Sequence, residues 1–360
     1  MNAVMRRAVM GALAVTMTVS AAACGETGGD TGVSRKDKSI GLLLPDYATK
    51  RYEKFDRPLI GGKITSLCPD CKIAYANADG DPARQAQQVR DMIKLGVKVL
   101  ILGAQDAVGI KASVQEAVDA GVKVVAYDRF AQGPVTAYVS YDNEKVGELQ
   151  GQALLNAMGS KATPSANVVM INGDDADPNA AQFKAGAHRV LDGKVTIAYE
   201  QSGLWKDTVA KQKVTEAIGR LGAKNIDGVY SANDGMAGGI ATALKGAGID
   251  VPLTGQDADL TGIQRILAGQ QTSTVYKAFK PEAEATAEIA VKLLHGDDIS
   301  SVADTTATSG SGTTVPAKLL TAVSVTRANL KDTVVKDAVY LVVQICTANY
   351  AAACEAAGIR

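Results

Sequence analysis

The sequence predicts an α/β protein with two lobes, each an open, doubly wound parallel sheet, and a cleft between the lobes. Short β-branched runs alternate with amphipathic stretches from residue 39 onward, and the same alternation restarts after residue 135. Near-continuous apolar runs such as residues 97–102 are typical of strands covered on both faces. A chain of 360 residues is long enough for two such domains.

Each lobe is expected to consist of strand–helix–strand units with right-handed connections. In the first lobe we expect strands at residues 39–46, 72–77, 97–102 and 122–128, and helices from about residue 51 and at 82–95 and 107–120. In the second we expect strands at 167–172, 195–199, 228–232, 251–255 and 272–276, and helices at 144–158, 179–191, 208–221, 235–247 and 260–268. Further elements are an extended stretch at 135–140, a helix at 281–294, a Thr/Ser/Gly-rich loop at 304–314 and an extended stretch at 319–325.

The composition is that of a globular protein with no strong charge bias. Hydrophobic residues make up 46% and charged residues 21% of the chain. The 38 basic side chains balance the 38 acidic ones, so no basic surplus points to nucleic acid or to an anionic membrane. With only 2 histidines, most metal and acid–base constellations are excluded.

The first 24 residues have the pattern of an export signal. Arg6 and Arg7 precede an apolar run at residues 8–19 that is too short to span a bilayer, and small residues lead to Cys24. This arrangement resembles a bacterial lipoprotein signal, although Ala21 stands where leucine is usual. We therefore expect a signal peptide at residues 1–24, lipidation of Cys24 and a flexible polar tether at residues 25–38. A buried core helix is the disfavoured alternative.

The other cysteines form two pairs that are close in sequence, Cys68 with Cys71 and Cys346 with Cys354. In an exported protein an even count favours disulfides. The Cys68–Cys71 spacing also occurs in redox motifs and in half of a zinc site. A redox motif should open a helix after a strand, and no second CxxC completes a zinc site. Structural bridges are therefore the favoured interpretation.

Polar side chains follow nearly every predicted strand. Ligands of open α/β sheets bind beyond the carboxyl ends of the strands, so these side chains are candidates for a binding site. Carboxylates, amides and cations suit a neutral polyol, whose hydroxyls both donate and accept hydrogen bonds. The candidates are Asp46, Asp128, Arg129, Asp142, Asn143, Asp177, Asn179, Asn233, Asp234, Gln256, Asp257 and Lys277.

Helix capping is the alternative role for the Asp and Asn residues. It accounts well for Asp142 and Asp177. It does not account for Arg129, Gln256 and Lys277, because these residue types are poor caps. The combination favours a site.

Other chemistries have little support in the sequence. Residues 77–81 begin like a calcium loop but lack the required later glycine and glutamate. Gly235, Gly238 and Gly239 do not form a dinucleotide fingerprint and are expected to permit close packing. No GxxxxGK[ST] phosphate loop is present, and a Ser/His/Asp triad is not credible with so few histidines. We expect no catalytic residue, metal ion or cofactor.

The strand-end residues belong to longer motifs, which extend over the chain from about residue 39 to residue 340. They are Tyr127-Asp128-Arg129, Tyr138-Val-Ser-Tyr-Asp142-Asn143, Asp177-Pro178-Asn179, Ser231-Ala-Asn233-Asp234, Thr254-Gly-Gln-Asp257 and Thr274-Val-Tyr276-Lys277. Together they resemble the periplasmic binding proteins that serve sugar ABC transporters, most closely the D-xylose-binding branch.

This resemblance implies two lobes joined by three hinge crossings, of the type I periplasmic binding protein kind. The crossings would fall near residues 140–143, 277–280 and 320–325. The first lobe would comprise residues 39–141 and 278–323, and the second lobe residues 142–277 and 324–345. Residues 346–360 would form a disulfide loop outside the family core.

The resemblance also implies roles for residues of the first lobe. Arg51 is expected to donate to the sugar through its guanidinium fork. Tyr52 stands where the branch has a tryptophan, so the stacking surface there is smaller. Asp128 and Arg129 are expected to bind adjacent hydroxyls.

From the second lobe, Asn179, Asn233, Asp257 and Lys277 are expected to close on the sugar. Trp205 is expected to lie against the apolar face of the pyranose ring. The alternative, a tryptophan of the core, is disfavoured because Gly203 and Lys206 flank it.

The function implied is that of a non-enzymatic solute-binding protein. It would capture a monosaccharide, D-xylose first and glucose or a similar aldopyranose second, and hand it to ABC transporter permease subunits. We expect an exported monomer, on the outer side of the membrane or in the periplasm, that touches the membrane only through its lipid anchor. The alternatives are a receptor for another small solute or signalling sugar, a secreted CxxC redox protein, and a cytoplasmic sugar-responsive repressor, which would need an N-terminal helix-turn-helix.

Overall fold

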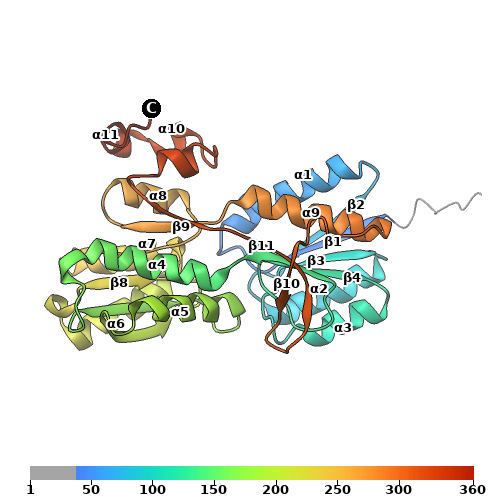
Figure 1. Ribbon diagram of the computed structural model, residues 1–360, viewed down its shortest axis with the longest axis horizontal. Coiled ribbons are helices and arrows are strands. Elements are labelled where there is room, and N and C mark those ends of the chain that lie inside the picture. Colours follow the sequence, from blue (N-terminus) through green and yellow to red (C-terminus); the bar gives the residue numbers. More distant parts are fainter. Residues whose placement is uncertain (1–37) are drawn as a thin grey trace, which may run out of the picture. The chain divides into compact units, whose positions relative to one another are not determined.

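The structure is a computed structural model that describes residues 38–360. The predicted signal peptide, Cys24 and nearly all of the predicted tether lie outside the described residues. The predicted fold class, two α/β lobes dominated by parallel sheets, is confirmed (Figure 1).

The first lobe is built on a seven-stranded sheet with the order β10-β11-β5-β4-β3-β1-β2. All neighbours are parallel except β10 and β11. The strands are β1 (Ser39–Leu44), β2 (Lys72–Asn77), β3 (Val99–Leu102), β4 (Lys123–Tyr127), β5 (Ala137–Tyr141), β10 (Thr305–Thr308) and β11 (Thr314–Leu320).

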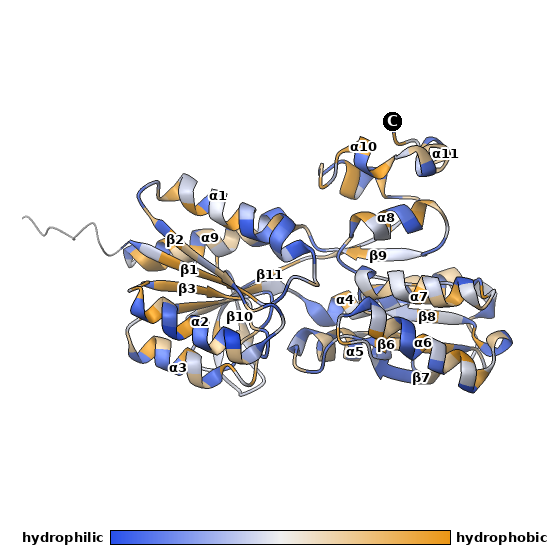
Figure 2. Ribbon diagram, turned by 180° about the vertical axis from the view of Figure 1, so that it is seen from behind, coloured by the Kyte–Doolittle hydropathy of each residue, from blue (hydrophilic) through white to orange (hydrophobic). Residues whose placement is uncertain are grey.

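Helices cover both faces of this sheet, which explains its apolar strands (Figures 1 and 2). Alternate residues of β1 point to opposite faces. Leu42 packs on the side of α1 and α9, and Leu43 on the side of α2 and α3. The helices are α1 (Arg57–Leu67), α2 (Pro82–Lys94), α3 (Lys111–Asp119) and α9 (Phe279–His295).

The second lobe has a three-stranded parallel sheet, β7-β6-β8, and a two-stranded antiparallel sheet, β12-β9. The strands are β6 (Asn167–Asn172), β7 (Thr196–Ser202), β8 (Gly228–Ser231), β9 (Ser273–Tyr276) and β12 (Val323–Thr326). Around them α4 packs on α5 and α6 packs on α7. The helices are α4 (Asn143–Met158), α5 (Pro178–Leu191), α6 (Asp207–Leu221), α7 (Asp234–Gly246) and α8 (Leu260–Leu267).

One predicted strand is wrong. Residues 251–255 form only an isolated bridge between Leu253 and Val229. Pro252 has no N–H to donate, so the ladder to β8 is limited to the bonds on either side of Val229. The Thr272 N–H donates to the Leu253 carbonyl oxygen at 2.7 Å, and the Leu253 N–H donates to the Thr272 hydroxyl at 3.2 Å, so this segment links the two small sheets.

The predicted loop at 304–314 is also partly wrong. Its threonines form β10, which pairs antiparallel with β11 and extends the first-lobe sheet. Threonine is β-branched and suits a pleated strand at a sheet edge. The prediction of a loop rested on the Thr, Ser and Gly content of the segment, which does not distinguish such a strand from a loop. The predicted extended stretch at 319–325 is divided, because β11 ends at Leu320 and β12 begins at Val323.

Two glycines allow α4 and α5 to touch. A Cβ atom at Gly147 would lie 2.0 Å from the Phe183 carbonyl oxygen, and one at Gly186 would lie 1.9 Å from the Glu144 carbonyl oxygen. Only glycine permits this approach. Gly239 has the same effect between α7 and α6, with its would-be Cβ 2.0 Å from the Asp207 carbonyl oxygen.

The chain passes between the two sets of sheets at three places. These are the junctions between β5 and α4, between β9 and α9, and between β11 and β12. Hydrogen bonds tie the junctions together. The Tyr141 hydroxyl donates to the Ala278 carbonyl oxygen at 2.7 Å, and the Asp142 N–H donates to the Leu320 carbonyl oxygen at 3.3 Å.

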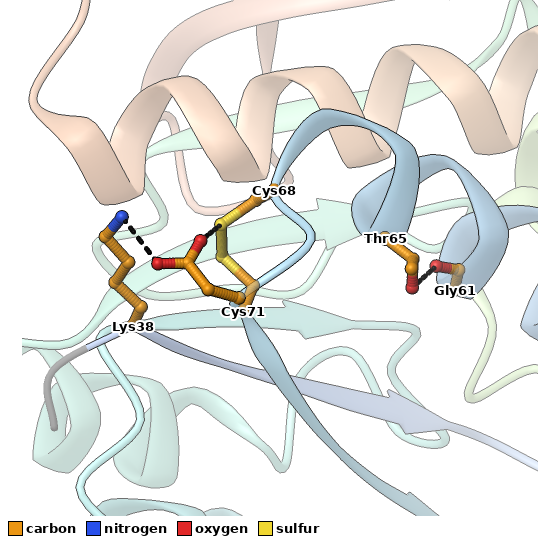
Figure 3. Close-up of a disulfide and its surroundings, with 6 residues drawn as sticks. Lys38, Gly61, Thr65, Cys68 and Cys71 are labelled. Atoms are coloured by element: carbon orange, nitrogen blue, oxygen red, sulfur yellow. Dashed lines mark hydrogen bonds and ion pairs between the residues drawn. A yellow bond between two sulfur atoms is a disulfide. The ribbon is translucent and has the colours of Figure 1, made fainter. Parts of the chain in front are cut away.

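Both predicted cysteine pairs are disulfides in the structure. Cys68–Cys71 joins the end of α1 to the start of β2, next to an ion pair between Lys38 and Asp70 (Figure 3). Cys68 follows a helix rather than opening one, which is unlike a redox motif. The two sulfurs bond to each other, so they do not form half of a zinc site.

The C-terminal segment packs on α8. Cys354 is only 1% exposed and lies in an apolar cluster with Ile345, Leu330 and Ile359. The Cys346–Cys354 bridge closes this segment through α10 (Val342–Ile345) and α11 (Ala351–Ala356). The extension therefore contributes to the core of the second lobe.

Removing either disulfide is expected to lower stability modestly. Short loops restrict the unfolded chain little, so the paired changes Cys68→Ser with Cys71→Ser, or Cys346→Ser with Cys354→Ser, should each cost about 1–3 kcal/mol in denaturant unfolding. Peptide mapping without reductant should recover each pair as its own loop. Four free thiols, or pairing between the two ends of the chain, would contradict this.

Candidate functional site

Most of the predicted site residues surround one small cavity between the lobes. Its volume is about 20 Å³, roughly the room of a single water molecule. The opposing side chains therefore nearly meet. The cavity is lined by Thr49, Arg51, Tyr52, Asp128, Arg129, Asp177, Asn179, Phe183, Trp205, Asn233, Gln256, Asp257 and Lys277.

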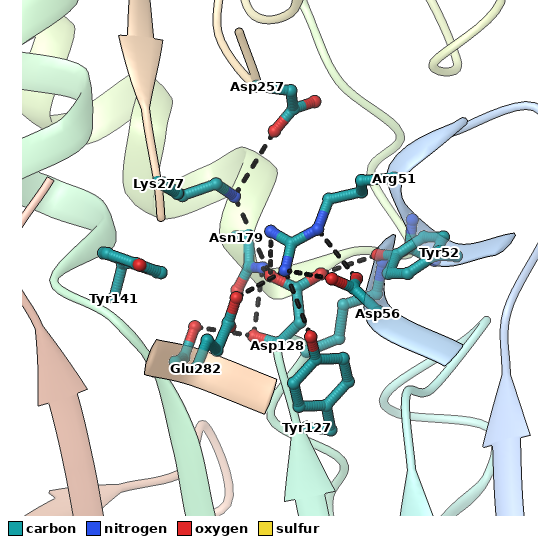
Figure 4. Close-up of polar contacts among 12 residues, drawn as sticks. Arg51, Tyr52, Asp56, Tyr127, Asp128, Tyr141, Asn179, Asp257, Lys277 and Glu282 are labelled. Carbon is teal, nitrogen blue, oxygen red and sulfur yellow. Dashed lines mark hydrogen bonds and ion pairs between the residues drawn. The ribbon is translucent and has the colours of Figure 1, made fainter. Parts of the chain in front are cut away.

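Arg51 stands at the start of a π-helical turn, Tyr52–Asp56, a feature that often accompanies functional sites. Its guanidinium is buried, and the Nε–H donates to the Asp56 carboxylate at 2.8 Å (Figure 4). Nη2 donates to the Tyr127 hydroxyl at 3.2 Å and to Glu282. Nη1 has no hydrogen-bond partner among the described residues. One nitrogen of Arg51 is thus left to serve a ligand.

Asp128 is held in a strained backbone conformation, with φ at +58°. Its carbonyl oxygen accepts from the Ser140 and Tyr138 hydroxyls, at 2.9 and 3.0 Å. Its carboxylate accepts from the Tyr52 hydroxyl at 2.6 Å. Burial raises the pKa of Asp128, but the charges of Lys277 and Arg51 outweigh burial and hold the pKa below its usual value. The carboxylate is therefore ionised and oriented.

Arg129 joins the two lobes directly. Its Nε lies 2.8 Å from the Asp177 carboxylate, and its Nη2 lies 3.4 Å from Asp46. Asp177 also accepts from the backbone N–H of Asn179 at 2.9 Å, so it caps α5. Burial raises the pKa of Asp177 to about 6, against the opposing charge of Arg129. The ion pair brings the carboxyl end of β4 against the start of α5.

Lys277 lies between carboxylates of both lobes. Its Nζ is 3.8 Å from Asp128 and 3.6 Å from Asp257. Asn179 reaches across as well and donates to the Asp128 carbonyl oxygen at 3.1 Å. The cross-lobe contacts at Lys277 and Asn179 converge on Asp128 (Figure 4).

The apolar part of the wall comes from the second lobe. Phe183 and Trp205 meet edge to face, with ring centroids 6.4 Å apart. The Trp205 backbone has φ at +57°, and its Nε1 has no hydrogen-bond partner among the described residues. Asp257 is a further positive-φ residue, at +89°. Such conformations are rare outside glycine and concentrate at functional sites.

The remaining predicted site residues lie outside the cavity wall. Asp46 is behind Arg129 and accepts from the Thr49 N–H at 2.7 Å. Asp142 is exposed and caps α4, so the capping alternative is correct for it. Asn143 is buried one layer back and donates to Asn179 at 2.9 Å.

Asp234 is fully buried beneath the site and also does not line the cavity. It accepts from the Asp259 N–H at 2.8 Å and from Gln271 at 2.6 Å. Burial raises its pKa to about 8. Its role is to hold the start of α8 against α7.

Sequence reasoning missed several residues of the site. Thr49 and Phe183 line the cavity without a strand-end signal. Asp177, a candidate for which capping was the alternative, has both roles, because it caps α5 and pairs with Arg129. Glu282 lies within a predicted helix, so no local pattern marks it.

A family model described as periplasmic binding protein domain matches residues 47–298. The chain belongs to the periplasmic binding protein family. The resemblance seen in the sequence is thereby confirmed. The D-xylose-binding periplasmic protein of Escherichia coli K12 is 38% identical over 84% of this chain and 91% of that protein. The multiple sugar-binding periplasmic protein SbpA of Azospirillum brasilense is 31% identical over 87% of this chain and 93% of that protein.

Solved structures agree with this assignment. A carbohydrate transporter solute-binding protein from Chloroflexus aurantiacus, in complex with D-glucose, has a TM-score of 0.74 and 25% identity, covering 84% of this chain and 96% of that one. These relatives of the chain are sugar-binding transport proteins rather than enzymes. Over residues 38–360, no helix has both the length and the apolar character needed to cross a membrane.

Proposed function

We propose that this periplasmic binding protein captures a monosaccharide between its lobes and delivers it to the permease of an ABC transporter. One observation carries the proposal: charged and amide groups from both lobes converge on one small space beside Trp205 and Phe183. A pyranose presents matching surfaces, hydroxyls at its rim and C–H groups on its faces.

D-xylose is the first candidate sugar and D-glucose the second. The E. coli and A. brasilense relatives, named for D-xylose and for multiple sugars, support this order. Tyr52 is smaller than the tryptophan of the xylose branch, which favours room for an extra carbon. Selection against epimers is expected to be stronger, because a misplaced hydroxyl leaves a buried charge unpaired at a cost of about 1–3 kcal/mol.

Sugar entry requires the lobes to part, since the cavity holds about 20 Å³. The contacts of Arg129 with Asp177 and of Lys277 with Asp128 would open, and sugar would then favour the closed form through contacts to both lobes. The moving bodies would be residues 39–141 with 278–323, and residues 142–277 with 324–345.

A monosaccharide panel tests the proposal. D-xylose or D-glucose should raise the melting temperature, because a ligand that binds only the folded protein stabilises it. The radius of gyration in solution scattering should fall on saturation, and Trp205 fluorescence should change with the same midpoint. Tight binding of an amino acid or peptide, with no response to any monosaccharide, would remove the proposal. Scattering curves that are identical with and without saturating sugar would contradict the proposed closure of the lobes.

The protein is proposed to be an exported monomer that is anchored by a lipid on Cys24. Cys24→Ser is expected to release it from the membrane fraction or to block processing of the signal at residues 1–24. Cell fractionation and intact mass measure this, with Cys68→Ser as a control cysteine change. Unchanged membrane association and mass would contradict the anchor.

A further inference from the structure

We propose that Glu282 is a positioning residue for sugar binding: its carboxylate holds the Arg51 guanidinium so that Nη1 alone faces the ligand. The inference rests on the proposed function, because it concerns the donor that Arg51 offers to a sugar hydroxyl.

The contacts of Arg51 divide its nitrogens by role. Asp56 accepts from Nε at 2.8 Å and from Nη2 at 3.3 Å. Tyr127 and Glu282 accept from Nη2 as well. Nη1 has only a long ion-pair contact, 3.9 Å from Asp128. Nη2 has two N–H groups for these three acceptors, and without Glu282 it would keep only the contacts to Asp56 at 3.3 Å and to Tyr127 at 3.2 Å, so the guanidinium could turn away from the direction that leaves Nη1 facing the ligand.

Glu282 is placed to act through Arg51 and not on the ligand. It lies in the first turns of α9, shortly after the chain leaves β9 and Lys277, and it is fully buried. It is absent from the cavity wall, and behind Arg51 it points toward the guanidinium (Figure 4). The start of α9 is itself fixed, because the Ala278 carbonyl oxygen accepts from Tyr141.

Stability does not account for this carboxylate. A buried charge costs several kcal/mol to desolvate, and a well-packed apolar side chain of similar size often does as well or better. The neighbours on α9, Ala283 and Ala287, belong to the apolar core of the lobe. Asp56 alone already gives Arg51 a buried counter-charge. Glu282 instead sets the direction in which the Arg51 guanidinium points.

The test is calorimetric titration of the full chain with D-xylose, D-glucose and the mono-deoxy analogues of each. Glu282→Leu removes both charge and acceptor, and it should weaken binding of the preferred sugar about tenfold or more. Glu282→Gln keeps an acceptor and should recover part of the loss. The matched control is Glu284→Leu, on the same helix at the surface, which should stay within about twofold of the unmodified protein.

The deoxy analogues separate positioning from a merely structural role. One analogue lacks the hydroxyl that Nη1 serves, and for it the unmodified protein and Glu282→Leu should agree within about twofold. An equal loss for every analogue would overturn the inference, as would an unchanged affinity in Glu282→Leu. If Glu282→Leu does not fold, Glu282→Gln and Glu282→Asp are compared on the same analogues, and the same equal loss or absence of effect decides against it. Failure of the unmodified, folded protein to bind any monosaccharide would instead remove the proposed function.

Discussion

Arg129→Ala and Asp257→Ala are each expected to weaken monosaccharide binding at least tenfold, equivalent to about 1.4 kcal/mol. Arg129 reaches both lobes, through Asp46 and Asp177. Asp257 belongs to the second lobe, and its carboxylate lies 3.6 Å from the Lys277 Nζ. Removing either side chain deletes a proposed polar partner of the sugar, and Arg129→Ala also leaves the buried Asp177 carboxylate without its ion-pair partner.

Calorimetry on each variant measures this loss, with melting curves to show that the fold is retained. Matched controls are Arg189→Ala, whose guanidinium pairs at the surface with Glu144 and Glu148, and Asp250→Ala, which is exposed. Near-wild-type affinity in both Arg129→Ala and Asp257→Ala would remove the proposed site.

Arg51→Met is expected to destabilise the sugar-free protein by about 3–5 kcal/mol, because removing one partner of a buried ion pair leaves an uncompensated charge. Arg51 is 1% exposed, and its partners Asp56 and Glu282 are fully buried. Urea unfolding measures the loss. The triple change Arg51→Met, Asp56→Asn and Glu282→Gln should recover most of it. A loss below about 1 kcal/mol would mean that water screens the charges of Arg51, Asp56 and Glu282.

The destabilisation of Arg51→Met should depend on pH. Burial raises the pKa of Asp56, and it raises the pKa of Glu282 to about 7, with Arg51 opposing the rise in both. A carboxyl with a raised pKa in the folded state binds a proton on folding, so its contribution to stability is present at low pH and is lost as pH rises through that pKa. The deficit should therefore be largest above pH 7 and shrink toward pH 5. A loss of stability that is the same at pH 5 and above pH 7 would contradict this.

The sequence by itself determined the fold class, the order of the elements and most of the cavity wall. Strand periodicity and the restart after residue 135 are local patterns, and the polar residues that follow strands must gather at the carboxyl edges of the sheets. Local pattern also placed both cysteine pairs, because each pair closes a short loop.

Only the tertiary structure decided which polar residues face the cavity and which stand behind it. Asp142 and Asp177 have the same local pattern of a helix cap, yet Asp142 is exposed and Asp177 pairs with Arg129 across the lobes. Asp56 is a local partner of Arg51, but the other buried partners come from distant parts of the chain, Tyr127 at a separation of 76 positions and Glu282 at 231. A helix sequence does not record which of its polar residues will meet a charge from another element, because that depends on how the elements pack.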